Sequence, residues 1–201
     1  MRLSPDISTG NRLLDVLPTK SLERLQPRLE LVALVLDEPV PSHQHLYFPV
    51  AGLISVVTTM ADGASVEIGM IGREGMYSVS AILGEDMPLQ TAVVQFPGCA
   101  LRLKTRTLRQ EIQADAALQK LLLRYTQATL NAVAQSAACN RLHLLEQRCA
   151  RWLLAFHDRA ETDSFRMTHE FLAMMLGVRR PGITFAARSL QEQGLISYKA
   201  L

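Results

Sequence analysis

Residues 168–196 read THEFLAMMLGVRRPGITFAARSLQEQGLI, and their spacing predicts two helices joined by a tight turn. A helix-turn-helix needs a small residue where its helices cross, a glycine that turns the chain with a positive φ, and apolar residues between the helices. Ala173 supplies the small residue, and Gly177, four residues later, supplies the turn. The apolar positions that would hold the second helix on the first are Leu172, Leu176, Val178, Ile183, Ala187 and Leu190.

The ends of both helices are also marked in the sequence. Thr168 is a suitable N-cap for the first helix, because its hydroxyl can accept a hydrogen bond from an early amide. Pro181 fits the first turn of the second helix, where amides have no partner within the helix. Gly194, followed by Leu195 and Ile196, ends that helix and predicts the start of a strand, as in winged variants of the motif.

The outer face of the second helix carries the predicted function. Arg179 and Arg180 stand at its entry, and Thr184 and Arg188 follow one and two turns later. Guanidinium groups bind the edge of guanine in two-pronged fashion or bind backbone phosphates, so this face is typical of a recognition helix in the major groove. Together with Thr168, these residues are the predicted DNA contacts. The alternative, a helical hairpin that docks on another protein, stays open.

Charge is unevenly distributed along the chain. Residues 141–201 carry nine basic against six acidic side chains, whereas residues 1–140 carry twelve against thirteen. Since duplex DNA attracts surfaces rich in lysine and arginine, the basic excess at the C-terminal end agrees with a DNA-binding domain there.

The composition is that of a globular protein. The chain has 201 residues, of which 48% are hydrophobic and 20% charged, so one or two domains are possible. No apolar run reaches about 18 residues, and the N-terminus lacks a signal pattern, which predicts a cytoplasmic protein with no membrane partner. Cys99, Cys139 and Cys149 are widely spaced and predict buried free thiols rather than disulfides or a metal site.

Short runs rich in β-forming residues dominate the first half of the chain. They cover residues 31–36, 52–59, 64–70 and 92–96 and are separated by turn residues. Asp62-Gly63, between two of these runs, is a strong hairpin signal. Many short strands at near-regular spacing predict a small barrel or sandwich.

A long helix is expected next, because residues 107–140 contain neither glycine nor proline. Its apolar residues cover more than one face, and Leu123, Leu130 and Ala137 recur every seven residues. Such a helix can bury its second face against another copy of the chain. A central helix buried within one chain is the alternative. The predicted domains are therefore residues 1–106, 107–140 and 141–201.

Catalytic and metal-binding motifs are not found in the sequence. There is no phosphate loop, no ordered Ser/His/Asp set and no metal-ligand box, so an enzyme is not expected. Glu67, Glu74 and His169 are interpreted as a barrel-surface, a barrel-loop and a helix-start residue, respectively. His43 and His45 share one face of an expected strand and are interpreted as surface residues near a turn rather than haem or metal ligands.

Several motifs together resemble the Crp/Fnr superfamily of bacterial transcription regulators over about residues 13–201. They are Tyr47-Phe-Pro, Gly52-Leu-Ile-Ser, Ile71-Gly-Arg-Glu-Gly-Met, Arg148-Cys-Ala-Arg-Trp-Leu-Leu and the helix-turn-helix stretch. The resemblance implies an α+β fold with a cyclic-nucleotide-binding-like double-stranded β-helix (jelly-roll) barrel, a long dimerisation helix and a winged helix-turn-helix. It also implies a homodimeric regulator that binds a palindromic operator, with RNA polymerase as a further partner.

The residues that the resemblance assigns to effector binding depart from the cyclic-AMP pattern. The implied effector residues are Gly72, Arg73, Glu74, Gly75, Met76, Gln90 and Thr91. Gln90 and Thr91 stand where an Arg-Ser pair would hold a cyclic phosphate, and an amide cannot replace the charge and geometry of a guanidinium group. Val133 and Ala134 likewise cannot hydrogen-bond to a base through their side chains. The sequence therefore argues against cyclic AMP and leaves the effector unidentified.

Other family cofactors and contacts fit the sequence no better. Iron–sulfur members hold their cluster with clustered N-terminal cysteines, whereas the first cysteine here is Cys99, which argues against such a cluster. Pro181 and Gly182 stand where relatives use a glutamate for a base contact, so a different operator is expected. A second function stays open: a cyclic-nucleotide-binding-like module that regulates a partner protein and has a vestigial helix-turn-helix.

Overall fold

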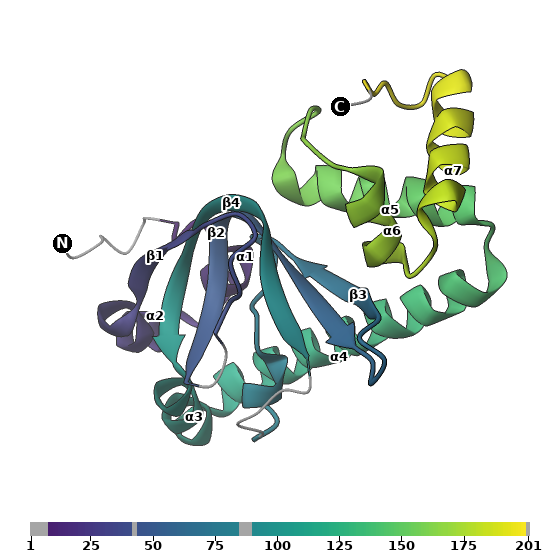
Figure 1. Cartoon of the computed structure of the whole chain (residues 1–201). Helices are drawn as coiled ribbons and strands as arrows, with labels where there is room; N and C mark the ends of the chain where they lie inside the picture. Colours follow the sequence, from purple (N-terminus) through teal and green to yellow (C-terminus); the bar gives the residue numbers. More distant parts are fainter. Residues whose placement is uncertain (1–7, 42–43, 85–89, 200–201) are drawn as a thin grey trace.

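The computed structural model describes residues 8–41, 44–84 and 90–199, and Figure 1 shows the chain. Two short helices, α1 (Arg12–Asp15) and α2 (Thr19–Leu25), and a 3-10 turn η1 (Gln26–Arg28) come first. The strands are β1 (Glu30–Leu34), β2 (His45–Thr59), β3 (Ser65–Ile71) and β4 (Thr91–Lys104), with η2 (Val79–Ala81) before β4. The helices α3 (Thr105–Ala114), α4 (Ala116–Leu142), α5 (Leu145–Ala160), α6 (His169–Leu176) and α7 (Arg180–Glu192) complete the chain.

The strands form one antiparallel sheet in the order β1-β4-β2-β3. The predicted α+β class is confirmed, and the described strands pair in one open, strongly bent sheet. The predicted hairpin is also present: β2 and β3 are joined through Gly63, whose φ is +86°, and Met60 N donates to Ala64 O. His43 lies outside the described residues.

A bend divides the long strands β2 and β4 into two halves (Figure 1). The register between them shifts three times over residues 49–54. Gly52 has a φ of +87°, and a Cβ at this position would lie 2.6 Å from the carbonyl oxygen of Phe96. A side chain on Gly98 would likewise strike the backbone of Ala51. The two backbones therefore approach closely enough to bend together only because both residues are glycine.

Three hydrophobic clusters use the two faces and two halves of this sheet. The first packs α1 to α4 against Leu46, Phe48 and Leu103, and the second packs α5 to α7 against Leu53 and Val57. The third lies around Tyr47 and Ile54, on strand residues that include Val94 and Ala100. Because one cluster contains both sheet residues and C-terminal helix residues, the helix-turn-helix is docked directly on the sheet.

The predicted single helix over residues 107–140 is wrong in one respect, because the chain leaves the helical conformation at Asp115. Its φ is −138°, and its carboxylate accepts hydrogen bonds from Ala117 N and Leu118 N, which caps α4. The same carboxylate accepts from Ser21 Oγ at 2.6 Å and pairs with Arg24 at 2.7 Å. These hydrogen bonds hold the pKa of Asp115 well below its usual value. A tertiary contact with α2 thus divides the helix.

The cysteines are free thiols, as predicted. Cys139 and Cys149 are buried, and Cys99 is partly exposed. Burial raises the pKa of Cys149 to about 11, so this thiol stays protonated and unreactive at neutral pH. Within the described ranges, no helix combines the length and the apolar character that a bilayer span requires.

Candidate DNA-binding surface

The helix-turn-helix forms as its sequence predicts. Thr168 Oγ1 accepts a hydrogen bond from Phe171 N at 3.1 Å and so caps α6. Gly177 ends α6 in the left-handed conformation with a φ of +63°. Ala173 is buried at the crossing of the helices, and Ile183 of α7 is completely buried. Local signals therefore determine this motif, because each of its caps and contacts lies within a few residues of its partner.

One face of α7 is free for a ligand. Arg179, Arg180, Thr184 and Arg188 are exposed, whereas the opposite side of the helix is buried against α5 and α6. In the described part of the chain, no ion pair engages Arg179 or Arg180, while Arg188 Nε lies 2.9 Å from Glu192 Oε1. The helix entry therefore presents two uncommitted guanidinium groups.

Phe185 also lies on this exposed face, and sequence reasoning did not select it. Its side chain is 74% exposed, which is unusual for a large aromatic residue on a packed helix. An apolar side chain on a recognition helix can contact the methyl group of thymine. The signal was present in the sequence, because Phe185 follows Thr184 and lies outside the apolar positions that face α6.

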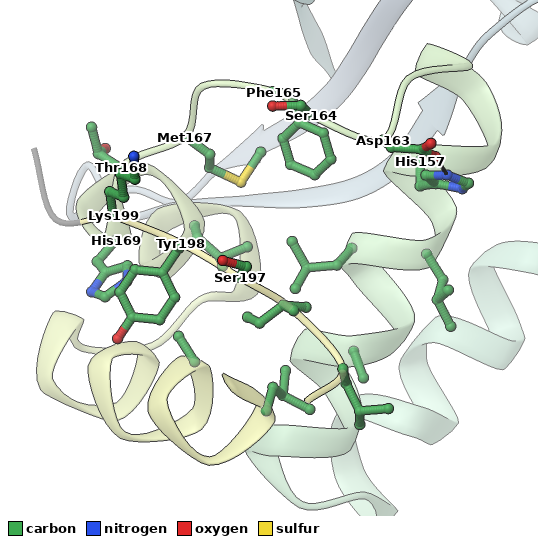
Figure 2. A pocket seen from close by; sticks show the side chains of 18 of the residues that line it. His157, Asp163, Ser164, Phe165, Met167, Thr168, His169, Ser197, Tyr198 and Lys199 are labelled. Carbon is green, nitrogen blue, oxygen red and sulfur yellow. Dashed lines mark hydrogen bonds and ion pairs between the residues drawn. The ribbon is translucent and has the colours of Figure 1, made fainter. Parts of the chain in front are cut away.

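The tail after α7 crosses a cavity beside the predicted contact residues. This cavity has a volume of about 940 Å³ and lies between α5, α7 and the tail. Figure 2 shows Tyr198 beside His169, with their ring centroids 5.2 Å apart. His169 Nδ1 in turn lies 3.1 Å from Thr184 Oγ1. The described residues after Gly194 contain no strand, so the predicted wing strand does not form there.

Aromatic contacts and a tight turn dock the helix-turn-helix on the second half of the sheet. Phe156 of α5 lies edge-on to Phe96 of β4 at 6.0 Å and stacks on Trp152 at 5.6 Å. The turn at Gly177 rests on β3, because a Cβ there would lie 3.2 Å from Val66 Cγ2. The position of α7 is therefore coupled to the sheet and not only to α4.

A polar network lies inside this apolar interface. Trp152 Nε1 donates to Glu67 Oε1 at 2.9 Å, and Ser55 Oγ donates to Glu67 Oε2 at 2.6 Å. Burial raises the pKa of Glu67 to about 7, and these two hydrogen bonds and the charge of Arg159 offset only part of that effect. Glu67 therefore changes its charge near neutral pH at the contact between β3 and α5.

We expect the Glu67→Gln variant to lose part of the pH dependence of stability. Because the pKa of Glu67 is higher in the folded state than its ordinary value of 4.5, the folded state binds the proton more tightly. Protonated Glu67 therefore adds about 1 to 3 kcal/mol to the free energy of unfolding. This stabilisation is fully present below about pH 4.5 and is lost as the pH rises to about 7. The carbonyl oxygen of glutamine still accepts from Trp152 Nε1, and its amide nitrogen can donate to Ser55 Oγ, so both contacts remain without the charge.

Urea unfolding at pH 5 and pH 8 measures this effect. The parent protein should lose more stability than the variant between these values, and the variant should be the more stable of the two at pH 8. Groups common to both proteins cancel in the comparison. Parallel pH profiles would contradict ionisation of Glu67 in this interface.

The loop predicted to bind an effector contacts the helix-turn-helix domain. Arg73 pairs with Glu161, and Arg159 Nε lies 2.6 Å from Glu74 Oε1. Both partners lie at the end of α5, Arg159 within the helix and Glu161 directly after it. The loop therefore joins the sheet to the C-terminal domain through two ion pairs.

The other predicted effector residues are distributed over two places. Gly72 and Met76 flank the ion-paired residues, and Gly75 lies against the ring of Tyr125, whose hydroxyl donates to Met76 O. Ile71, just before the loop, pairs with Ile54 of β2, whereas Thr91 pairs with Val57, three residues further along the same strand. Gln90 directly precedes Thr91. The structure thus brings Gly72 to Met76 together with α4 and α5, whereas Thr91 lies on β4, on the other side of β2 from β3. Effector binding stays a prediction.

An unpartnered apolar face runs along α4. Leu118 and Leu122 are buried against the first cluster, but Leu123 is 47% and Leu130 57% exposed. Ala137, one heptad further, is exposed too. The heptad positions therefore face away from the rest of the chain.

The C-terminal segment and the whole fold match known proteins. Residues 147–200 match the family model of the Crp-like helix-turn-helix domain. The fold resembles that of the c-di-GMP responsive global regulator CLP of Xanthomonas campestris, with 16% identity and a TM-score of 0.73 over 91% of this chain and 96% of that one. A crp/fnr family transcriptional regulator of Eubacterium rectale has 16% identity and a TM-score of 0.75, over 96% and 92%.

FixK2 of Bradyrhizobium japonicum is similar as well, with 14% identity and a TM-score of 0.73 over 86% of this chain and 89% of that one. No curated protein sequence matches the chain. These likenesses confirm the predicted resemblance: the chain has the Crp/Fnr fold and ends in a Crp-like helix-turn-helix domain.

Proposed function

We propose that this chain, with its Crp/Fnr fold and Crp-like helix-turn-helix, is a sequence-specific DNA-binding transcription regulator that acts as a homodimer. The observation that carries the proposal is the exposed face of α7, which presents Arg179, Arg180, Thr184 and Arg188 to solvent. In this proposal α7 enters the major groove, Arg180 reads a base, and Phe185 contacts a thymine methyl group. Thr168 and Arg179 bind backbone phosphates.

We expect the Arg180→Ala variant to bind operator DNA about 5 to 150 times more weakly, which corresponds to about 1 to 3 kcal/mol for a base contact. The operator is first selected from random duplexes, and affinity is then measured by fluorescence anisotropy at several salt concentrations. The control is Lys20→Ala, which removes one positive charge from the exposed surface of α2. An operator affinity that changes neither with salt concentration nor with Arg180→Ala would exclude α7 as the recognition helix.

The proposed dimer forms through α4. Leu123, Leu130 and Ala137 would pack against the same residues of a second copy, as heptad positions do in a coiled coil. Such symmetric pairing presents two α7 helices to half-sites about one helical turn of DNA apart, so the operator should be palindromic. The exposure of Leu123 and Leu130 in the single chain supports this arrangement.

The proposed sensing acts through the loop that contains Arg73 and Glu74. Both residues pair with the C-terminal end of α5, so a small effector that engaged either side chain would compete with those ion pairs. Release of α5 would alter how the helix-turn-helix rests on the sheet. The hydrogen bond between Trp152 and Glu67 in the polar network supports this coupling, because it joins α5 to β3.

A further inference from the structure

A strongly basic pocket lies at the end of the sheet remote from α7. It has a volume of about 300 Å³. The residues that line it are Arg28, Glu30, His45, Arg102, Lys104, Arg106 and Thr107. Four permanent positive charges thus face one carboxylate. The lining residues come from η1, β1, β2, β4 and α3, so the folded chain, rather than one run of sequence, assembles the pocket.

Strand register explains how these charges meet. Glu30 of β1 lies opposite Arg102 of β4, and His45 of β2 lies opposite Lys104. Arg102 and Lys104 are two residues apart and therefore point to the same face of the sheet. Leu103, between them, points to the other face and is buried in the first cluster. The basic side chains therefore converge because of the sheet and cannot separate without disrupting it.

Most of this charge has no counterion within the described chain. Arg102 pairs with Glu30 at 2.7 Å, but its buried Nε has no hydrogen-bond partner among the described residues. No carboxylate in the same ranges pairs with Arg28, Lys104 or Arg106. Burial and the charge of Arg102 lower the pKa of His45, which agrees with a positive potential in the pocket. Like charges held this close destabilise one another unless an anion joins them.

We propose that this pocket binds a small phosphorylated anion through its phosphate groups. Arginine presents donors in a fork that matches phosphate oxygens, and Arg28 and Arg106 provide two such forks, with Lys104 as an additional charge beside the Arg102–Glu30 pair. A volume of about 300 Å³ lies at the lower end of the range for small-molecule sites, so the pocket suits a diphosphate rather than a polymer.

The pocket is separate from the proposed DNA-binding face. Figure 1 shows α3, which carries Arg106 and Thr107, at the opposite end of the molecule from α7. It is also separate from the loop at Arg73 and Glu74, since none of its lining residues belongs to that loop. The anion site therefore does not depend on the proposed recognition of an operator, and it can be tested without DNA.

The experiment is isothermal titration of the full chain with inorganic pyrophosphate, and in a second arm with ADP, at constant ionic strength set with chloride. The test variant is Lys104→Gln/Arg106→Gln, which removes two unpaired charges but leaves the Arg102–Glu30 pair. The control is Lys20→Gln/Arg166→Gln, which removes one lysine and one arginine at exposed positions elsewhere. Thermal unfolding checks that both variants fold.

We expect pyrophosphate to bind the parent and the control with affinities equal within twofold, and the test variant at least about tenfold more weakly, as for the loss of one or two charged hydrogen bonds. Equal affinities for pyrophosphate and ADP would show that the diphosphate alone is recognised, and tighter binding of ADP would add a nucleoside contact. Once an operator has been selected, its affinity for the parent and for the test variant should be equal, and the pyrophosphate titration needs no operator. No pyrophosphate or ADP binding by the parent, or equal loss in both variants, would overturn the proposal.

Discussion

Replacing Leu130 with glutamate is expected to convert the proposed dimer into a monomer and to weaken operator binding by at least about 100-fold. Leu130 is 57% exposed on α4 and would be buried against its counterpart in the second copy. Two carboxylates brought together in an apolar contact repel each other and lose their hydration, which costs several kcal/mol. A monomer then binds one half-site without the gain that a linked second half-site provides.

Ala128→Glu is the matched control for this prediction. Residue 128 is exposed on the same helix, but at about 100° per residue it lies about 200° around the axis from residue 130. The control should remain a dimer with unchanged operator affinity. Analytical ultracentrifugation of all three proteins at the same concentration measures the association. A monomeric parent, or a dimer that tolerates Leu130→Glu, would exclude α4 as the dimer interface.

Gly52→Ala is expected to lower the free energy of unfolding by about 3 to 5 kcal/mol. The substitution forces a left-handed conformation on a residue with a side chain, which costs about 1 to 2 kcal/mol. Its Cβ would also lie 2.6 Å from Phe96 O and 2.9 Å from Pro97 O. These atoms belong to the backbone of the paired strand and cannot move aside as a flexible side chain can, so overpacking adds a similar or larger cost.

Gly63→Ala separates the two contributions. Gly63 has nearly the same φ, +86°, but a Cβ there meets nothing within 4 Å. This control should therefore cost only about 1 to 2 kcal/mol, the conformational part of the effect. Denaturant unfolding of the parent and both variants gives the comparison. Equal losses would show that the bend at Gly52 does not depend on the close approach of the two strands.

The helix-turn-helix was predictable from sequence because its determinants are local. Thr168, Ala173, Gly177 and Pro181 each act within one or two turns of their own position, and the structure places each of them in its predicted role. The hairpin at Asp62-Gly63 was predictable for the same reason. Phe185 was not predicted, because an apolar residue on a packed helix normally indicates core, although its position between Thr184 and Arg188 marks the exposed face.

The division of the long helix shows where this kind of reasoning fails. Nothing near Asp115 ends a helix by itself, since residues 107–140 contain neither glycine nor proline. The break becomes favourable because Ser21 and Arg24, more than ninety residues earlier, bind the carboxylate that caps α4. The sheet bend at Gly52 and Gly98 depends in the same way on a pairing between distant strands.

The two helices around Gly177, their caps and the basic face of α7 could be predicted, because these features follow from contacts a few residues apart. The docking of α5 on the sheet through Trp152 and Glu67, and the meeting of Arg28, Arg102 and Arg106 in one pocket, depend on the fold of the whole chain. Those groups are separated by tens of residues, and strand register and helix packing bring them together. In the fold, burial raises the pKa of Glu67, and the shared pocket concentrates positive charge that no single stretch of sequence contains.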